Sequence, residues 1–135
     1  MAKLEDAKTS IRVKLSALWS SVMFLYVYGD YFNMYTPGKL ERMAAGSLGF
    51  GPANEGALVG VAALMAVPSL MIAGAVLLPA PLCKWLNVAL GLAYSAIMAL
   101  TMNGAPLFYV CMGVAEILLT LSIAWIALRW AKSQV

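Results

Sequence analysis

Four long apolar stretches constrain this chain more than any other feature of its sequence. They run over about residues 15–35, 57–78, 82–102 and 107–130. A helix needs roughly 20 mostly apolar residues to cross the hydrocarbon core of a bilayer. Lipid offers the backbone no hydrogen-bond partner, and the runs are too continuous for barrel strands, whose side chains alternate. The stretches therefore predict an all-α integral membrane protein, a four-helix bundle forming a single domain over residues 1–135.

Turn residues separate the four stretches. The linkers around residues 79–81 and 103–106 are short, so they predict antiparallel hairpins. The first linker, residues 36–56, is longer, and "PGKLERMAAG" within it predicts one short interfacial helix. The sequence "GSLGFG" at 46–51 lacks the spacing of a phosphate-binding loop, so an outer loop is expected there.

Lysine and arginine gather at one end of the predicted bundle. Seven belong to that end and two to the other: Lys3, Lys8, Arg12, Lys14, Lys84, Arg129 and Lys132 against Lys39 and Arg42. The positive-inside rule then predicts that both termini are cytoplasmic (N-in/C-in). The net charge of +3 is explained by this placement, so no nucleic-acid partner is expected. The first stretch is expected to remain uncleaved, because its apolar run is long for a signal peptide.

Several kinds of chemistry are excluded by composition. The chain has no histidine, and its two cysteines, Cys83 and Cys111, form no metal-binding or redox motif. They lie near opposite ends of their stretches, whereas a disulfide needs Cα atoms within about 7 Å, so both are expected to be free. No sequence motif of a hydrolase or nucleotide-binding enzyme is present. We expect no catalytic residues, no metal site and no cofactor, and the protein is not expected to be an enzyme.

Asp30 and Glu116 are the only carboxylates inside the four stretches. A charge at the centre of a membrane helix costs about 3 kcal/mol on insertion scales, so such residues usually face the bundle interior. Counting about 1.5 Å per residue places Asp30 roughly 8 Å, and Glu116 roughly 14 Å, from the outer ends of their helices. Both are expected in the outer half of the membrane, near one level if the first stretch packs on the fourth.

Three of the stretches each carry a stripe of polar, aromatic and methionine side chains at three- and four-residue spacing, and two of these stripes include the carboxylates. The predicted ligand- or proton-binding residues are Tyr26, Asp30, Asn33, Asn87, Tyr94, Tyr109, Glu116 and Thr120. One interpretation is a polar pocket, open to the outer face, that binds or transports a small ligand, cationic or coupled to protons. The alternative is a structural or accessory subunit whose polar residues hold helices together or dock a partner.

The absence of an internal cation favours the pocket. No lysine or arginine lies in the middle of a stretch, so a proton or a cationic ligand is needed to neutralise the carboxylates. A bundle of four short helices has little room for an enclosed pathway, so a transporter of this size is expected to form a homo-oligomer. Pro68 lies in the middle of the second stretch and should kink it, leaving the carbonyl of Leu64 without its usual donor.

Several segments together resemble a bacterial family of small four-helix membrane proteins of unknown function. They are "VKLSALWSSVMFLYVYGDYF", "TPGKLERM", "MAVPSLMI", "LNVALGLAYSAIMALTM" and "GVAEILLTLSIAW". The resemblance covers about residues 13–130 and implies the same four-span fold in a bacterial cytoplasmic (inner) membrane, with no assigned activity. The overall shape is also similar to that of the DoxX-like four-helix membrane proteins.

Overall fold

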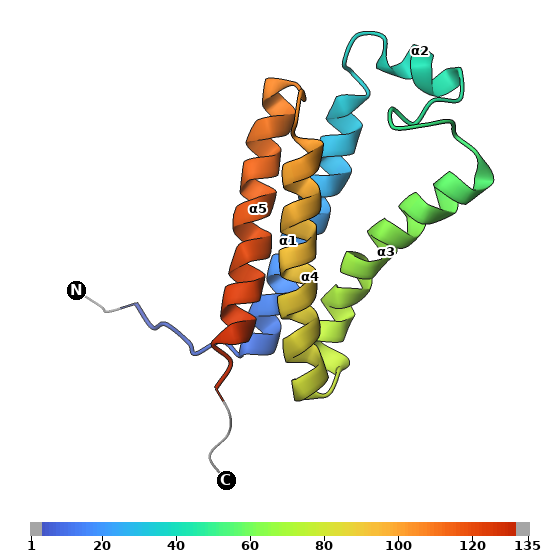
Figure 1. The fold of residues 1–135 in the computed structure, drawn as a ribbon. Helices are drawn as coiled ribbons and strands as arrows, with labels where there is room; N and C mark the ends of the chain where they lie inside the picture. The colour runs from blue at the N-terminus through green and yellow to red at the C-terminus, as the bar shows by residue number, and fades with distance from the viewer. Residues whose placement is uncertain (1–3, 132–135) are drawn as a thin grey trace.

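The computed structural model describes residues 4–131, and this part of the chain is helical without any strand (Figure 1). The helices are α1 (Ile11–Asn33), α2 (Lys39–Ala44), α3 (Glu55–Leu77), α4 (Ala80–Thr101) and α5 (Leu107–Leu128). The all-α prediction is confirmed. Four long helices overlap the four apolar stretches, and short α2 lies in the first linker.

Three of the described helices, α3, α4 and α5, are long and apolar enough to cross a membrane. Helix α1 is as long as α3 but is not among them; it carries Arg12, Lys14 and Asp30 as well as three serines. The structure therefore supports a membrane protein with three candidate spans. The place of α1 as a fourth span remains a prediction.

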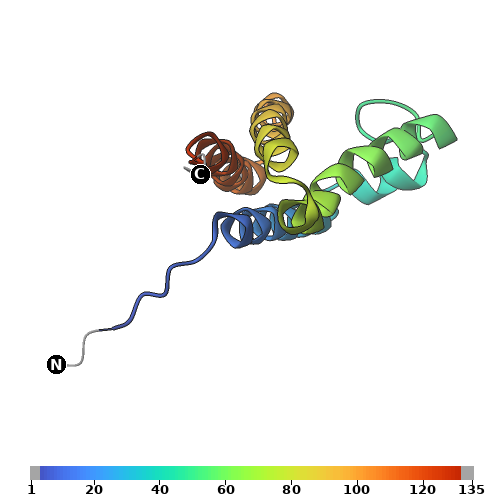
Figure 2. The ribbon, with the colours of Figure 1, turned by 90° about the horizontal axis from the view of Figure 1, so that it is seen from below.

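The helices do not pack as a symmetric bundle. Helix α1 packs on both α3 and α5, and α4 packs closely on α5, whereas α3 and α4 contact each other little. Seen from below, α3 extends away from the other three long helices (Figure 2). The predicted hairpin of α3 and α4 does reverse the chain, but its two helices then diverge.

The apolar core lies in the half of the molecule nearest the termini. Its buried residues are Leu15, Trp19, Val22, Met71, Ala75, Cys83, Val88, Tyr94, Ile123 and Ala127. Cys83 and Cys111 are both free, as predicted.

Polar bonds fasten the C-terminal half of α3 to α1. Arg12 Nη1 donates to the carbonyl oxygens of Ala75, Val76 and Leu78 at 3.3, 3.1 and 2.7 Å. These carbonyls lie in the last turn of α3 and just beyond it, where backbone acceptors lack helical donors. One turn further along α1, Ser16 Oγ donates to the carbonyl of Ile72 at 2.8 Å. This half of α3 is therefore fixed, and the half before Pro68 contains no buried residue.

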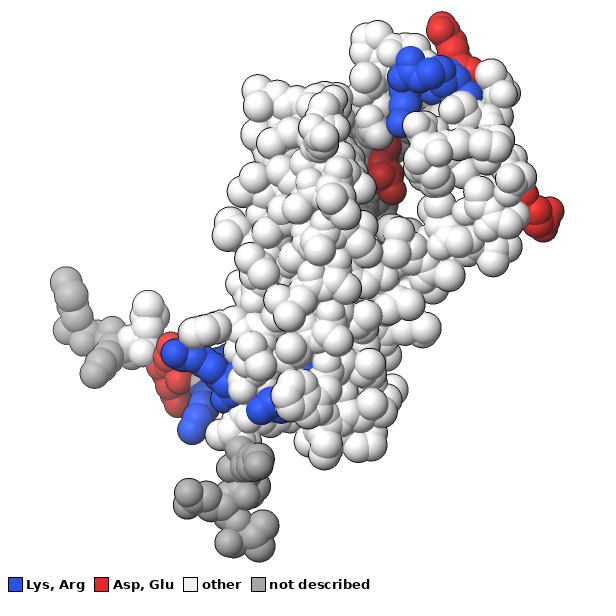
Figure 3. Space-filling model, viewed as in Figure 1, with Lys and Arg blue, Asp and Glu red and all other residues white. Residues whose placement is uncertain are grey.

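The basic residues divide between the two ends of the molecule (Figure 3). Lys8, Arg12, Lys14, Lys84 and Arg129 lie toward the end where the chain enters and leaves, and Lys39 and Arg42 lie on α2 at the other. Lys3 and Lys132, which were also predicted at the first end, lie outside the described residues.

Candidate functional site

A cavity of about 100 Å³ lies where α1, α3, α4 and α5 meet, beyond the apolar core. Its walls are formed by Tyr26, Gly29, Asp30, Leu64, Met65, Tyr94, Ile97, Met98, Thr101, Tyr109 and Glu116. None of these described residues is basic. A bound water needs at least about 10–15 Å³ of such space, so the cavity has room for several waters or for a small ligand group.

Asp30 and Glu116 both line this cavity, one from α1 and one from α5. They share it because α1 packs on α5. Gly29 lies at this contact: a β-carbon there would be in ordinary van der Waals contact with Met112 Cε at 3.7 Å and with Glu116 Oε1 at 3.9 Å. The two carboxylates of the chain's interior therefore border one space.

Glu116 is the buried member of the pair. Its side chain is 2% exposed, and Oε2 has no hydrogen-bond partner among the described residues. Asp30 is exposed on the open side of the cavity. A buried carboxylate oxygen without a donor is costly, since the desolvation of the charged group is not compensated. The site is therefore incomplete as the protein alone builds it: Glu116 needs a proton, a cation or a water.

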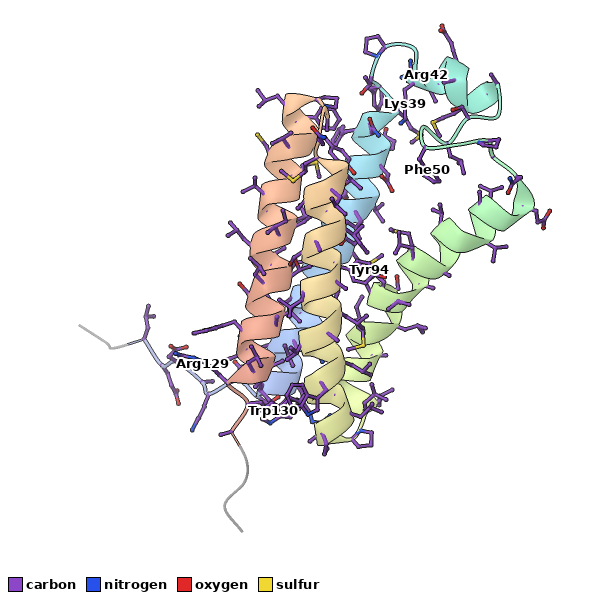
Figure 4. The ribbon with its side chains drawn as sticks, in the orientation of Figure 1. Lys39, Arg42, Phe50, Tyr94, Arg129 and Trp130 are labelled. Atoms are coloured by element: carbon purple, nitrogen blue, oxygen red, sulfur yellow. The ribbon has the colours of Figure 1, made fainter. Side chains whose placement is uncertain are left out.

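Tyr94, which lines the cavity, also compensates for the proline in α3. Its hydroxyl donates to the carbonyl oxygen of Leu64 at 2.6 Å. That carbonyl is the one deprived of a backbone donor by Pro68, four residues later in the helix. Figure 4 shows Tyr94 on the side of α4 that faces α3. A side chain of α4 thus replaces the missing backbone bond where α3 departs from the bundle.

Aromatic rings lie along one side of the cavity. The ring of Tyr94 meets Trp19 edge-on at 6.1 Å between centroids, and Tyr26 lies 6.4 Å from Tyr94 on the other side. Trp19 is fully buried in the apolar core. These three rings form an aromatic cluster that joins the wall of the cavity, which Tyr26 and Tyr94 line, to the apolar core, to which Trp19 belongs.

Five of the eight residues predicted for the site line the cavity: Tyr26, Asp30, Tyr94, Tyr109 and Glu116. The structure places the other three, Asn33, Asn87 and Thr120, elsewhere.

Asn87 lies beside Trp19 and not in the wall of the cavity. Trp19 Nε1 donates to Asn87 Oδ1 at 2.7 Å, and Asn87 Nδ2 donates to the carbonyl oxygen of Cys83 at 2.7 Å. Thr120 lies one turn from Glu116 and bonds Ser95 Oγ at 2.6 Å, between α5 and α4. Asn33 is the last residue of α1 and accepts from Thr36 Oγ1 at 3.4 Å. These side chains have protein partners and hold helices or a helix end in place.

Sequence reasoning missed the apolar wall of the cavity, which includes Met65 and Ile97. No signal could have found them, because one apolar residue in an apolar helix resembles the next. Leu64 had a signal, since Pro68 identifies its carbonyl as a free acceptor. In the described residues, no three Asp, Glu, Cys or His side chains are grouped so that they could hold a metal ion.

Comparison with known proteins gives a family but no activity. No curated protein and no solved structure matches this chain. Residues 3–135 match the model described as "Family of unknown function (DUF6326)". The chain therefore belongs to this family of unknown function.

Proposed function

We propose that this protein binds a small cation, or a ligand that exchanges with a proton, at the Asp30–Glu116 cavity and carries it through the membrane. One observation supports this most: Glu116 Oε2 is buried without a partner in the wall of a cavity that Asp30 also lines. Burying an unpaired charge costs several kcal/mol. A group that only held helices together would be expected to have protein partners, as Asn87 and Thr120 do.

The charges and the size of the cavity limit the ligand. Two carboxylates and no basic residue line the space, which favours a positive group over an anion. A volume of about 100 Å³ is small beside pockets for drug-sized molecules, which span roughly 300–1,000 Å³. The bound part is therefore an ion, a hydrated proton or the charged end of a larger molecule.

The proposal includes a membrane topology. Helix α1 is the fourth span beside α3, α4 and α5, and both termini are cytoplasmic in a bacterial inner membrane. The distribution of described basic residues in Figure 3 supports this orientation. The chain acts as a homo-oligomer, because a bundle of four short helices has little room for an enclosed pathway.

Ligand binding and proton release by the purified protein test the function. Ammonium, methylammonium and longer amines are added in weakly buffered detergent while melting temperature and pH are followed. A ligand at a hundred times its Kd stabilises the folded state by about 2.7 kcal/mol. We expect at least one cation to stabilise the wild type and release protons, Glu116→Gln to abolish both effects, and Asp30→Asn to weaken them.

The control variant is Glu55→Gln, which removes an exposed carboxylate in the first turn of α3, outside the cavity. It should respond to cations as the wild type does. A wild type that is neither stabilised nor deprotonated by any cation of the panel would overturn the proposed function.

The second candidate function is that of a structural or accessory subunit. The fully bonded polar pairs Trp19–Asn87 and Ser95–Thr120 favour it, since they join helices and leave no group for a ligand. On this function, the carboxylate variants would lose stability and no cation would affect the wild type. The same experiment therefore separates the two candidates.

A further inference from the structure

The N-terminal half of α3, residues 55–67, forms an arm that stands apart from the bundle. It contains no buried residue, although Ala57, Val61 and Met65 are half-buried on one face at four-residue spacing. Figure 3 shows a hollow between this arm and the bundle, with acidic atoms visible at its edge. The carboxylate cavity opens here, because Leu64 and Met65 of the arm share its wall with Ile97 and Met98 of α4.

Such a hollow has to be filled when α3 crosses a membrane. The wall that the arm contributes, with Leu64 and Met65, is apolar, so water gains little there, and the hydrocarbon chains of lipid are the surrounding solvent. The same hollow carries Asp30 and the unpartnered Glu116. One occupant satisfies both surfaces: a molecule with an apolar chain for the hollow and a cationic group for the carboxylates.

The outer end of the hollow is less suited to a cation. Lys39 and Arg42 on α2, together with the apolar Phe50 on the following loop, lie above it (Figure 4). Phe50 is 75% exposed, so the loop presents apolar surface without packing it against the bundle. Two positive charges at this end repel an approaching cation from the water, whereas the side of the hollow between α3 and α4 carries no such barrier.

We infer that the ligand is a cationic amphiphile with a single alkyl chain and an ammonium head, which enters sideways from the bilayer between α3 and α4. The head reaches Asp30 and Glu116, and the chain lies in the hollow against Met65 and Ile97. This inference rests on the proposed function and specifies the ligand class of that site. Lateral entry follows from the apolar walls, since a chain that starts in lipid never has to leave hydrocarbon.

Binding of amines of different chain length to the protein in lipid nanodiscs tests the inference. Methylamine and dodecylamine are compared, with dodecanol as the uncharged chain, and affinities are expressed per ligand present in the bilayer. We expect dodecylamine to bind at least about tenfold more tightly than either of the other two, because it uses both surfaces. Glu116→Gln should reduce dodecylamine binding to the level of dodecanol.

Two variants block the hollow from opposite walls, Met65→Trp on α3 and Ile97→Trp on α4. Each should weaken dodecylamine binding by about tenfold or more, and by more than it weakens methylamine binding, because the added ring takes the place of the alkyl chain. The matched control is Leu70→Trp, because Leu70 is 70% exposed on α3 and does not line the cavity. An unchanged melting temperature shows that a variant is folded, and having two blocking variants keeps the test decisive if one of them is not.

The outcomes separate this inference from the function on which it rests. Equal affinity for methylamine and dodecylamine, unaffected by both blocking variants, overturns lateral entry and leaves the cation site standing. Binding of dodecanol as tight as that of dodecylamine, with no effect of Glu116→Gln, shows a lipid groove and overturns the inference. No binding of any amine overturns the proposed function itself.

Discussion

At the scale of single residues, Gly91 sets how closely α4 approaches α5. A β-carbon at this position would lie 2.7 Å from the carbonyl oxygen of Thr120 and 3.1 Å from Ala124 Cβ. The first distance is to backbone, which cannot rotate away as a side chain can. Small residues allow membrane helices to approach in this way, and the Ser95–Thr120 bond at 2.6 Å forms beside the contact.

We expect Gly91→Ala to destabilise the protein by about 1–3 kcal/mol, because the added methyl group forces the two helices apart. The measurement is the free energy of unfolding in mixed micelles. Gly60→Ala is the matched control, since a β-carbon at position 60 of α3 meets nothing within 4 Å. Equal effects of the two substitutions would show that α4 and α5 are not in this close contact.

At the scale of elements, α3 divides into two halves with different partners. Arg12 and Ser16 of α1 hold its C-terminal half, while the half before Pro68 leaves the bundle. The hydroxyl of Tyr94 bonds the carbonyl of Leu64 at this division. A proline inside a membrane helix is tolerated when a neighbouring helix satisfies the backbone group that the proline frees.

This arrangement predicts coupling between Tyr94 and Pro68. Tyr94→Phe leaves the Leu64 carbonyl without a donor and should cost about 1–3 kcal/mol of unfolding free energy. In the Pro68→Ala background the backbone N–H of residue 68 supplies the donor, so the same substitution should cost less. A double-mutant cycle should give a coupling of at least about 0.5 kcal/mol.

Additive costs in that cycle would contradict the exchange of donors. Tyr28→Phe serves as the control, because Tyr28 lies on α1 with 54% of its side chain exposed. Its effect should stay within about 0.5 kcal/mol in either background.

At the scale of the whole molecule, packing and polarity divide along the length of the helices. The end near the termini is closed by the apolar core and by Arg12, and the opposite end is open between α3 and the bundle. The carboxylate cavity lies where the closed half meets the open one. The cavity is bordered on one side by the aromatic cluster of Trp19, Tyr26 and Tyr94. Another side is the N-terminal half of α3, which contains no buried residue and continues into the half that Arg12 and Ser16 hold.

The helices and the two carboxylates could be predicted from sequence because each leaves a local signal. Long apolar runs predicted the helices α3, α4 and α5. A carboxylate inside an apolar run identified Asp30 in α1 and Glu116 in α5 as candidates for the site. Pro68 predicts a change of direction in α3 at the point where its N-terminal half leaves the bundle, but the direction of the splay leaves no local signal, because it depends on tertiary packing. Asn87 and Tyr94 lie on one face of α4, yet Tyr94 lines the cavity whereas Asn87 is bonded to Trp19 of α1. Which residue of α4 meets Trp19 depends on tertiary packing, so the sequence could not separate the two roles.

We predict that α1 crosses the membrane as a fourth span, and labelling of single cysteines tests this topology. Thr9→Cys, Ser47→Cys and Asn103→Cys are made in a background lacking Cys83 and Cys111. If α1 crosses the membrane, a maleimide that cannot cross it should label positions 47 and 103 in intact bacteria, and position 9 only after permeabilisation. If α1 lies on the surface instead, position 9 shares the side of position 47, and all three label together.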